Sequence, residues 1–299
     1  MIKQRVLVVG YGEMGHAMQH LLHHHHDMTV WHCDSPEGMV TPLTQAAADK
    51  NFVILCIPTG PLYEVVSTLK PALHEDTLVL SIAKGLDSKG RVAFDAVSSA
   101  LDSSTPRVVI YGPMISEELR ADRPGFAQVG SPEPEWAQRT MSLFADSGLY
   151  LTSTADTTGI SWCAVLKNIY AMAFGMADEL RLGDNVRGYL ATVTLQELAA
   201  ISRQKGGTDA APYGLAGLGD LLTTATSTDS HHHALGMQLA RGERDDLAGE
   251  GTHTIELISK LDLIDTRHYP LMKLIQEIVL TDSDVREMWQ HYLDGTFQS

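Results

Sequence analysis

The amino-terminal half of the chain alternates short apolar runs with amphipathic stretches. The runs are rich in Val, Ile and Leu and predict strands, whereas the stretches between them predict helices. This alternation is typical of an α/β fold built on a parallel, doubly wound sheet. The predicted strands cover residues 5–9, 28–32, 52–57, 78–82 and 107–111, with two further short strands at 125–129 and 149–152.

The pattern changes after Thr152. A polar break at residues 153–159 is followed by apolar positions at helical spacing, without a further strand signal. We therefore expect two domains, an α/β domain at 1–152 and an all-helical domain at 153–299. Predicted helices cover residues 160–177, 186–205, 254–261 and 271–280, and two more begin near Asp220 and after Ser230.

The segment 160–177 is almost wholly apolar, yet Lys167 and Asn168 lie in its middle. Its length approaches that of a membrane span, but these polar residues favour a core helix of a soluble protein. Burying an unpaired ammonium is expensive. Lys167 is therefore either a functional lysine or one that covers apolar surface while its ammonium stays in water.

Composition limits the classes of function. The 299 residues are 44% hydrophobic and 20% charged, as in an ordinary globular protein, and the net charge of -15 argues against nucleic acid or anionic membrane as a partner. The three cysteines have neither metal nor redox spacing, and the chain enters its first strand without a targeting segment. We expect a soluble, cytoplasmic protein.

Two runs of histidine, at 23–26 and 231–233, raise the question of a metal site. Consecutive side chains on a helix point in different directions, so one ion does not gather them with good geometry. Neither run has a carboxylate or cysteine at ligand spacing. We expect no bound metal.

The first strand ends in a G-x-G-x-x-G motif formed by Gly10, Gly12 and Gly15, with Glu13 and Met14 between the last two glycines. An amphipathic stretch follows, which is the context that a dinucleotide-binding loop requires. The first glycine allows the tight turn, the second lets the backbone approach a pyrophosphate, and the third lets helix and strand pack closely. The amino-terminal domain is therefore predicted to be a Rossmann-type dinucleotide-binding domain.

Asp34 closes the second predicted strand at the distance where an acidic residue binds the ribose hydroxyls of NAD. The next Lys or Arg is Lys50, so a 2′-phosphate would lack an obvious counter-charge. We predict NAD as the cofactor in preference to NADP. The alternative is that Asp34 is an ordinary turn residue before Ser35 and Pro36.

Other polar residues follow predicted strands or open predicted helices. Lys84 lies just past the fourth strand, at the edge where open α/β sheets bind ligands. Asp220 ends the glycine-rich segment 214–219, predicted as a loop, and is either a helix cap or a catalytic carboxylate. Ser230 is predicted to cap the next helix.

The ordered combination of these motifs resembles the NAD(P)-dependent glycerol-3-phosphate dehydrogenases, over nearly the whole chain. In that family a doubly wound domain binds the cofactor and an all-helical domain supplies the catalytic lysine. The matching segments are Gly10–Gly15, Ala83–Leu86, Gly112-Pro113 with Glu118, Cys163–Asn168 with Gly175, Gly183 and Asn185, Gly206-Gly207, 214–221 with Thr224, and Glu250-Gly251 with Thr254 ahead of Pro270.

The resemblance implies a role for individual residues. Lys167 is the catalytic lysine that exchanges a proton with the substrate while the cofactor transfers hydride. Ser116 lies by the nicotinamide, and Glu250 contacts the cofactor. The resemblance also makes a homodimer plausible. The substrate site that it implies contains Lys84, which also faces the cofactor, together with Gly112, Asn168, Asp220, Thr224, Ser230, His231 and His232.

One departure from the family concerns the phosphate of the substrate. Family members carry Ser-Arg-Asn where this chain has Ser230, His231 and His232. Arginine grips phosphate as a bidentate fork, which histidine does not reproduce, although a helix amino terminus binds anions unaided. Glycerol 3-phosphate is the predicted substrate. The alternatives are another small hydroxy acid or polyol phosphate, or a nucleotide-sensing protein without turnover.

Overall fold

The computed structural model describes residues 2–33, 41–227, 230–245, 247 and 249–297. The chain divides into two compact units, Met1–Ser161 and Trp162–Ser299. The sequence predicted the domain boundary at Thr152, before the start of the first long helix. Asp34, the predicted ribose ligand, lies outside the described residues.

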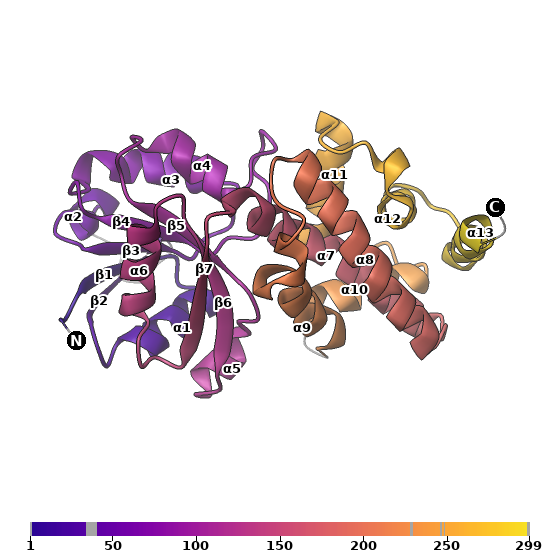
Figure 1. Cartoon of the computed structure of the whole chain (residues 1–299), viewed down its shortest axis with the longest axis horizontal. Helices are drawn as coiled ribbons and strands as arrows, with labels where there is room; N and C mark the ends of the chain where they lie inside the picture. Colours follow the sequence, from indigo (N-terminus) through magenta and orange to yellow (C-terminus); the bar gives the residue numbers. More distant parts are fainter. Residues whose placement is uncertain (1, 34–40, 228–229, 246, 248, 298–299) are drawn as a thin grey trace. The chain divides into compact units, whose positions relative to one another are not determined.

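The first unit contains one seven-stranded sheet in the order β2-β1-β3-β4-β5-β6-β7 (Figure 1). The predicted α/β class with a doubly wound sheet is confirmed, and each predicted strand is present. The strands are β1 (Arg5–Val9), β2 (Asp27–Trp31), β3 (Phe52–Leu55), β4 (Leu78–Ser81), β5 (Arg107–Tyr111), β6 (Gly125–Gly130) and β7 (Leu149–Thr154).

The sheet is parallel from β2 to β5, but β6 pairs antiparallel with β5. The chain turns back after β5 at Gly112, whose φ of 156° favours glycine. The Phe126 N–H then donates to the Pro113 carbonyl at 3.1 Å, which starts the antiparallel pairing. β7 returns to a parallel pairing with β6 after a helical crossover.

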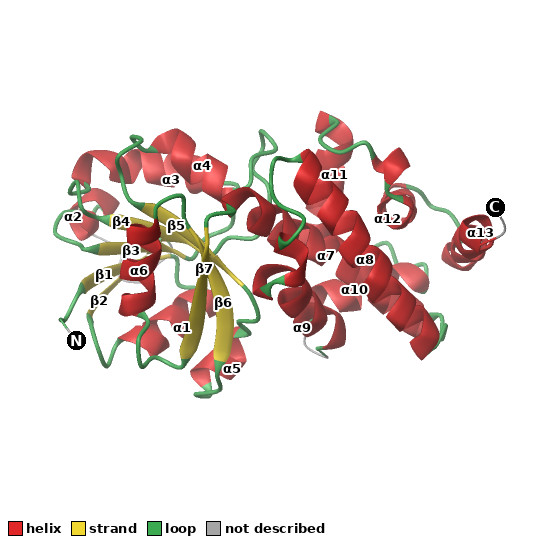
Figure 2. Ribbon diagram, in the orientation of Figure 1, coloured by secondary structure: helices red, strands yellow, loops and turns green. Residues whose placement is uncertain are grey.

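Helices cover both faces of this sheet (Figure 2). Alternate residues of β1 enter two separate cores, Val6 and Val8 on one face and Leu7 and Val9 on the other. The first core is closed by α1, α5 and α6, and the second by α2, α3 and α4. Their bounds are α1 (Glu13–Leu22), α2 (Leu43–Ala47), α3 (Leu62–Leu69), α4 (Ala93–Ala100), α5 (Ser116–Arg120) and α6 (Pro134–Leu143).

Helices make up the rest of the chain, beginning with α7 (Thr157–Glu179). Among the described residues, α7 alone is long and apolar enough to cross a membrane, and its most apolar window is 100% buried. Such burial is typical of a core helix, as predicted. The helices that follow are α8 (Asp184–Gln204), α9 (Asp220–Thr226), α10 (His231–Ala240), α11 (Glu250–Leu261), α12 (Pro270–Leu280) and α13 (Val285–Phe297).

Two features of the helical part differ from the sequence prediction. Leu215–Gly219 forms a turn of π-helix that runs directly into α9, where a glycine-rich loop was expected. A Cβ at Gly217 would lie 2.3 Å from the carbonyl oxygen of Pro212, so this close packing requires glycine. The last helix, α13, was not predicted.

Candidate active site

The glycine motif forms a tight turn between β1 and α1. Gly10 has a φ of 94°, and a Cβ there would lie 2.4 Å from the carbonyl oxygen of Cys56. A Cβ at Gly15 would lie 2.3 Å from the Gly10 carbonyl oxygen. Both glycines are therefore required by the packing of the loop itself.

Gly12 has a different environment, because a Cβ there would meet no described atom within 4 Å. Gly12 is also the N-cap of α1, so it has no side chain to occupy the N–H groups of the first helical turn. The Glu13 carboxylate turns aside to Arg120, 2.5 Å away, and Met14 packs against the core. The loop thus fits a bound pyrophosphate, which Gly12 and the backbone N–H groups of the first turn of α1 would hold.

Three other predicted residues lie in the same unit. Lys84 follows β4 and donates from Nζ to the carbonyl oxygen of Gly112, after β5, at 3.5 Å. Ser116, the first residue of α5, is buried and donates from Oγ to Glu117 at 2.8 Å. Lys84 and Gly112 therefore meet where β4 and β5 end, at the sheet edge that binds ligands in such folds.

The polar centre of the helical unit is Lys167. Its Nζ lies 3.0 Å from Oδ1 of Asp220 and donates to Oγ1 of Thr224 at 2.5 Å. The exposed fraction is only 6% for Lys167 and 3% for Asp220. Because a buried ammonium needs a counter-charge, Asp220 explains how α7 holds this lysine in its apolar middle.

The first turn of α9 positions both partners of Lys167. Asp220 is the first residue of α9 and Thr224 lies one turn later, so both face the same side. The Thr224 hydroxyl donates to the Asp220 carbonyl at 2.7 Å, which leaves its oxygen to accept from Lys167. Gly219 occupies the N-cap position, so the interpretation of Asp220 as a helix cap is wrong.

A second group of predicted residues surrounds the start of α11. Asn168 donates from its amide to Oε2 of Glu250 at 3.4 Å. A Cβ at Gly251 would lie 3.3 Å from Nδ1 of His232, and one at Gly249 would lie 3.2 Å from Nε2 of His231. The two imidazoles therefore lie against the backbone on either side of Glu250.

The three histidines of the run 231–233 contact different parts of the helical unit. Ser230 is the N-cap of α10, as predicted, and its Oγ accepts from the N–H of His233 at 3.3 Å. That N–H is therefore used by the cap. The His233 ring contacts the Asp178 carboxylate at 2.7 Å. Among the described residues, no group of three or more His, Cys, Asp or Glu side chains could hold a metal ion.

Glu197 of α8 is a buried polar residue that the sequence did not single out. Its carboxylate accepts from the hydroxyl of Tyr170 at 2.8 Å and from the N–H groups of Leu271 and Met272 at 2.8 and 3.0 Å. Burial raises the pKa of the Glu197 carboxyl, against the opposing effect of these three hydrogen bonds. A glutamate in the apolar stripe of a predicted helix is the signal that could have found it.

Comparison with known proteins agrees with this geometry. The sequence profiles for the amino and carboxyl termini of NAD-dependent glycerol-3-phosphate dehydrogenase match residues 38–137 and 156–290. The NAD(P)+ glycerol-3-phosphate dehydrogenase of Acaryochloris marina is 30% identical over 275 residues, which cover 89% of this chain and 87% of that protein. This chain belongs to the NAD-dependent glycerol-3-phosphate dehydrogenase family. The resemblance drawn from its motifs is confirmed.

Two further comparisons extend the family relation. The NAD(P)+ glycerol-3-phosphate dehydrogenase of Clostridium acetobutylicum is 30% identical over 203 residues, which span 68% of this chain and 61% of that protein. A solved glycerol-3-phosphate dehydrogenase of Coxiella burnetii has a TM-score of 0.85 at 24% identity and covers 98% of this chain and 99% of its own. The solved structure supports the fold, and the sequence matches support the family.

Proposed function

We propose that this protein interconverts glycerol 3-phosphate and dihydroxyacetone phosphate with NAD as the hydride carrier. The observation that carries the proposal is the buried ammonium of Lys167, held by Asp220 and Thr224 inside a helix that is otherwise apolar. Such a group suits proton exchange with an alcohol or carbonyl oxygen. The identity of the substrate is taken from the relatives of this chain, which are named for this activity.

The residues of this chain have separate tasks in the proposed reaction. Nicotinamide, when bound, would supply or accept the hydride at C2 of the substrate. Lys167 gives a proton from Nζ to the C2 oxygen during ketone reduction and takes it back during oxidation. Asp220 supplies the counter-charge of the lysine ammonium in the resting site, and Thr224 fixes the direction of that ammonium.

We assign the substrate's phosphate to the neighbouring helix termini. His231 opens α10, and its ring lies against Gly249, the N-cap of α11. Amino termini of helices favour anions, and a protonated imidazole adds charge. Ser230, His231 and His232 would thus replace the arginine that relatives use. Lys84, Gly112, Ser116 and Asn168 keep the roles that the resemblance implies, and Glu250 remains a proposed cofactor contact.

The decisive experiment follows NADH oxidation with a panel of small keto compounds. Dihydroxyacetone phosphate should give the highest kcat/KM, ahead of unphosphorylated dihydroxyacetone and of keto acids. A higher value for an unphosphorylated keto acid would favour the paralogue with another substrate. Absence of turnover with the whole panel, despite NADH binding, would favour a nucleotide-sensing protein.

Lys167→Met tests the proton-transfer role. Loss of a general acid–base group should lower kcat by about 10²-fold or more, with NADH affinity nearly unchanged. Lys205→Met is the matched control, because Lys205 is a half-buried lysine that lies over the ring of Trp162 at 4.7 Å, outside the proposed site. Retention of most of kcat in Lys167→Met would leave that lysine with a structural role only.

Three further features belong to the proposal. NAD is preferred to NADP on account of Asp34, the protein acts in the cytoplasm, and it forms a homodimer. The homodimer is tested by light scattering at the protein concentration of the assay. A monomer would remove the homodimer from the proposal and leave the chemistry unaffected.

A further inference from the structure

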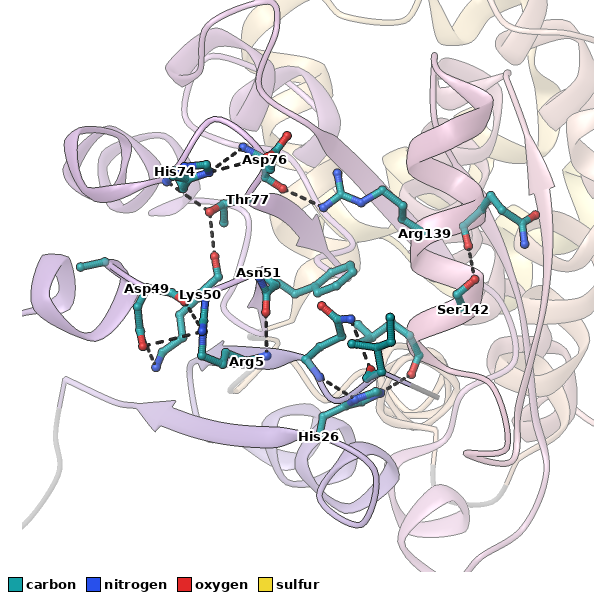
Figure 3. A pocket seen from close by; sticks show the side chains of 16 residues that line it. Arg5, His26, Asp49, Lys50, Asn51, His74, Asp76, Thr77, Arg139 and Ser142 are labelled. Atoms are coloured by element: carbon teal, nitrogen blue, oxygen red, sulfur yellow. Dashed lines mark hydrogen bonds and ion pairs between the residues drawn. The ribbon is translucent and has the colours of Figure 1, made fainter.

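A cavity of about 570 Å³ opens at the amino-terminal ends of β1, β3 and β4 (Figure 3). It lies within the first unit, at the edge of the sheet opposite the glycine loop, because Arg5 begins β1 and Gly10 follows its end. Ligands of open α/β sheets bind at the carboxyl ends of the strands. The proposed dehydrogenase chemistry therefore does not account for this cavity.

Hydrogen bonds between separate segments hold the walls in place. His26, 2% exposed, accepts from the Gln4 N–H at 3.3 Å through Nδ1, so its Nε2–H donates to the Leu143 carbonyl at 2.8 Å. Thr77 donates to the Lys50 carbonyl at 2.8 Å. The cavity is thus preformed, as small-molecule sites usually are.

The lining is richer in cations than the rest of the chain. Arg5, Lys50 and Arg139 line it, against two carboxylates, Asp49 and Asp76, whereas the whole protein has 22 Lys and Arg against 37 Asp and Glu. The Asp49 carboxylate lies 2.9 Å from the Lys50 ammonium and 3.8 Å from the Arg5 guanidinium. One carboxylate is therefore shared by two cations.

Arg139 is the third cation, and it extends from α6 on the other side of the cavity (Figure 3). It donates to the backbone carbonyl of Asp76 at 2.7 Å and lies over the Phe52 ring at 5.7 Å. Neither contact neutralises a guanidinium. The carboxylate of Asp76 itself is directed toward His74, 3.9 Å from Nδ1, and its side chain is 82% exposed.

We propose that this cavity binds a small organic anion with two or more negative charges, such as a polycarboxylate or a phosphate ester. Arg139 holds one charged end as a bidentate fork, and the Arg5–Lys50 pair attracts the other. The cavity volume leaves room for an organic body between them, against Phe52 and Leu143. This site is independent of the dehydrogenase activity proposed above.

Citrate is the probe, because it carries several carboxylates on a small body. Its binding to the full-length protein is measured by calorimetry at constant ionic strength, with chloride as the balancing anion. Saturable binding in the millimolar range or tighter is expected. Arg139→Gln should weaken it at least tenfold, whereas Arg123→Gln should leave it unchanged, because Arg123 pairs with Glu118 away from the cavity.

Two more variants separate loss of the anion site from destabilisation and from binding in the substrate site. Arg139→Gln could also destabilise the protein, which would appear as a lower unfolding midpoint in chloride without citrate. In that case Arg139→Lys is the second variant, and it should keep part of the citrate affinity because the positive charge remains. Lys167→Met should bind citrate as the wild type does. Loss of binding in Lys167→Met with full binding in Arg139→Gln would place citrate in the substrate site, and that result, or absence of saturable binding, overturns the proposal.

Discussion

Lys167 and Asp220 illustrate, at the scale of the residue, what a buried ion pair achieves. Removing two charges from water costs several kcal/mol per ion, and their attraction repays this only when the geometry is good. Apolar side chains of similar volume would therefore hold α7 and α9 together at least as well. The pair is better explained by the chemistry of its ammonium than by the stability of the helical unit.

His231 carries a prediction about the phosphate of the substrate. Arginine presents a permanent charge and a bidentate fork, which an imidazole does not reproduce. If His231 binds the substrate phosphate, His231→Arg should therefore lower KM for dihydroxyacetone phosphate. Steady-state kinetics of both proteins at pH 8 measure the effect.

A comparison at a single pH removes one ambiguity. Substrate phosphate gains its second charge near pH 6, so at pH 8 both proteins meet the same doubly charged substrate. A lower KM for the variant would support the assignment of His231 to the phosphate. Equal KM values at pH 8 would exclude His231 from the phosphate site.

At the scale of the element, glycines determine how α7 and α10 cross. A Cβ at Gly175 would lie 2.0 Å from the carbonyl oxygen of His233, and one at Gly236 would lie 2.1 Å from that of Met172. Backbone atoms on both sides leave no side chain that could move away. The two helices therefore touch through their backbones, next to the segment that bears Lys167.

This crossing predicts opposite effects for two Gly→Ala substitutions. Gly175→Ala should lower the free energy of unfolding by about 1–3 kcal/mol or more, because overpacking forces the helices apart. Gly188→Ala, at an exposed position of α8 with open space around it, should raise the free energy of unfolding by about 0.4–1 kcal/mol. Denaturant unfolding of both variants measures the difference, and equal stabilities would contradict the close crossing.

Glu197 links three helices, since it accepts from Tyr170 of α7 and from two N–H groups of α12. Burial raises its folded-state pKa above that of an unfolded glutamate, near 4.3. The folded protein therefore binds the proton more tightly, so the contribution of Glu197 to stability is greatest below the unfolded pKa. It declines as pH rises through the folded pKa.

The matched variant for this titration is Glu197→Gln, which cannot ionise. The free energy of unfolding of the wild type, measured relative to this variant, should fall as pH rises from about 4.3. Urea unfolding of both proteins at several pH values gives the difference. A difference that rises with pH would mean that the three hydrogen bonds outweigh burial and hold the carboxylate ionised.

At the scale of the whole molecule, the chain consists of two compact units. The glycine loop belongs to the first and Lys167 to the second. Cofactor binding and proton transfer should therefore be separable by mutation. A cofactor that binds only the native state stabilises the fold by about 2.7 kcal/mol when its concentration is a hundred times its dissociation constant.

This separation is measured by thermal unfolding with each cofactor. NADH should raise the unfolding midpoint more than NADPH does at the same concentration, because Asp34 would repel a 2′-phosphate. Asp34→Asn should reduce the difference between the midpoint shifts that NADH and NADPH cause. Lys167→Met should leave the midpoint shift caused by NADH unchanged. Equal shifts with both cofactors would remove the proposed preference for NAD, and loss of the NADH shift in Lys167→Met would contradict the separation.

Local pattern alone determined much of this protein. The strands of the first unit were predicted because a strand buried on both faces is a short apolar run, and the glycine loop because a G-x-G-x-x-G motif lies between such a run and an amphipathic stretch. Lys167 was predicted as unusual because its neighbours in sequence are apolar. These properties depend on residues that are close along the chain.

Tertiary structure decided what depends on distant residues. Asp220, 53 positions from Lys167, changes from a candidate helix cap to the counter-charge of the lysine only when α9 packs against α7. The antiparallel return of β6, the hydrogen bonds of Glu197 and the cation-lined cavity also join distant segments. Sequence periodicity indicates which face of a helix or strand is buried. Which other element packs against that face is decided by the packing of the whole chain.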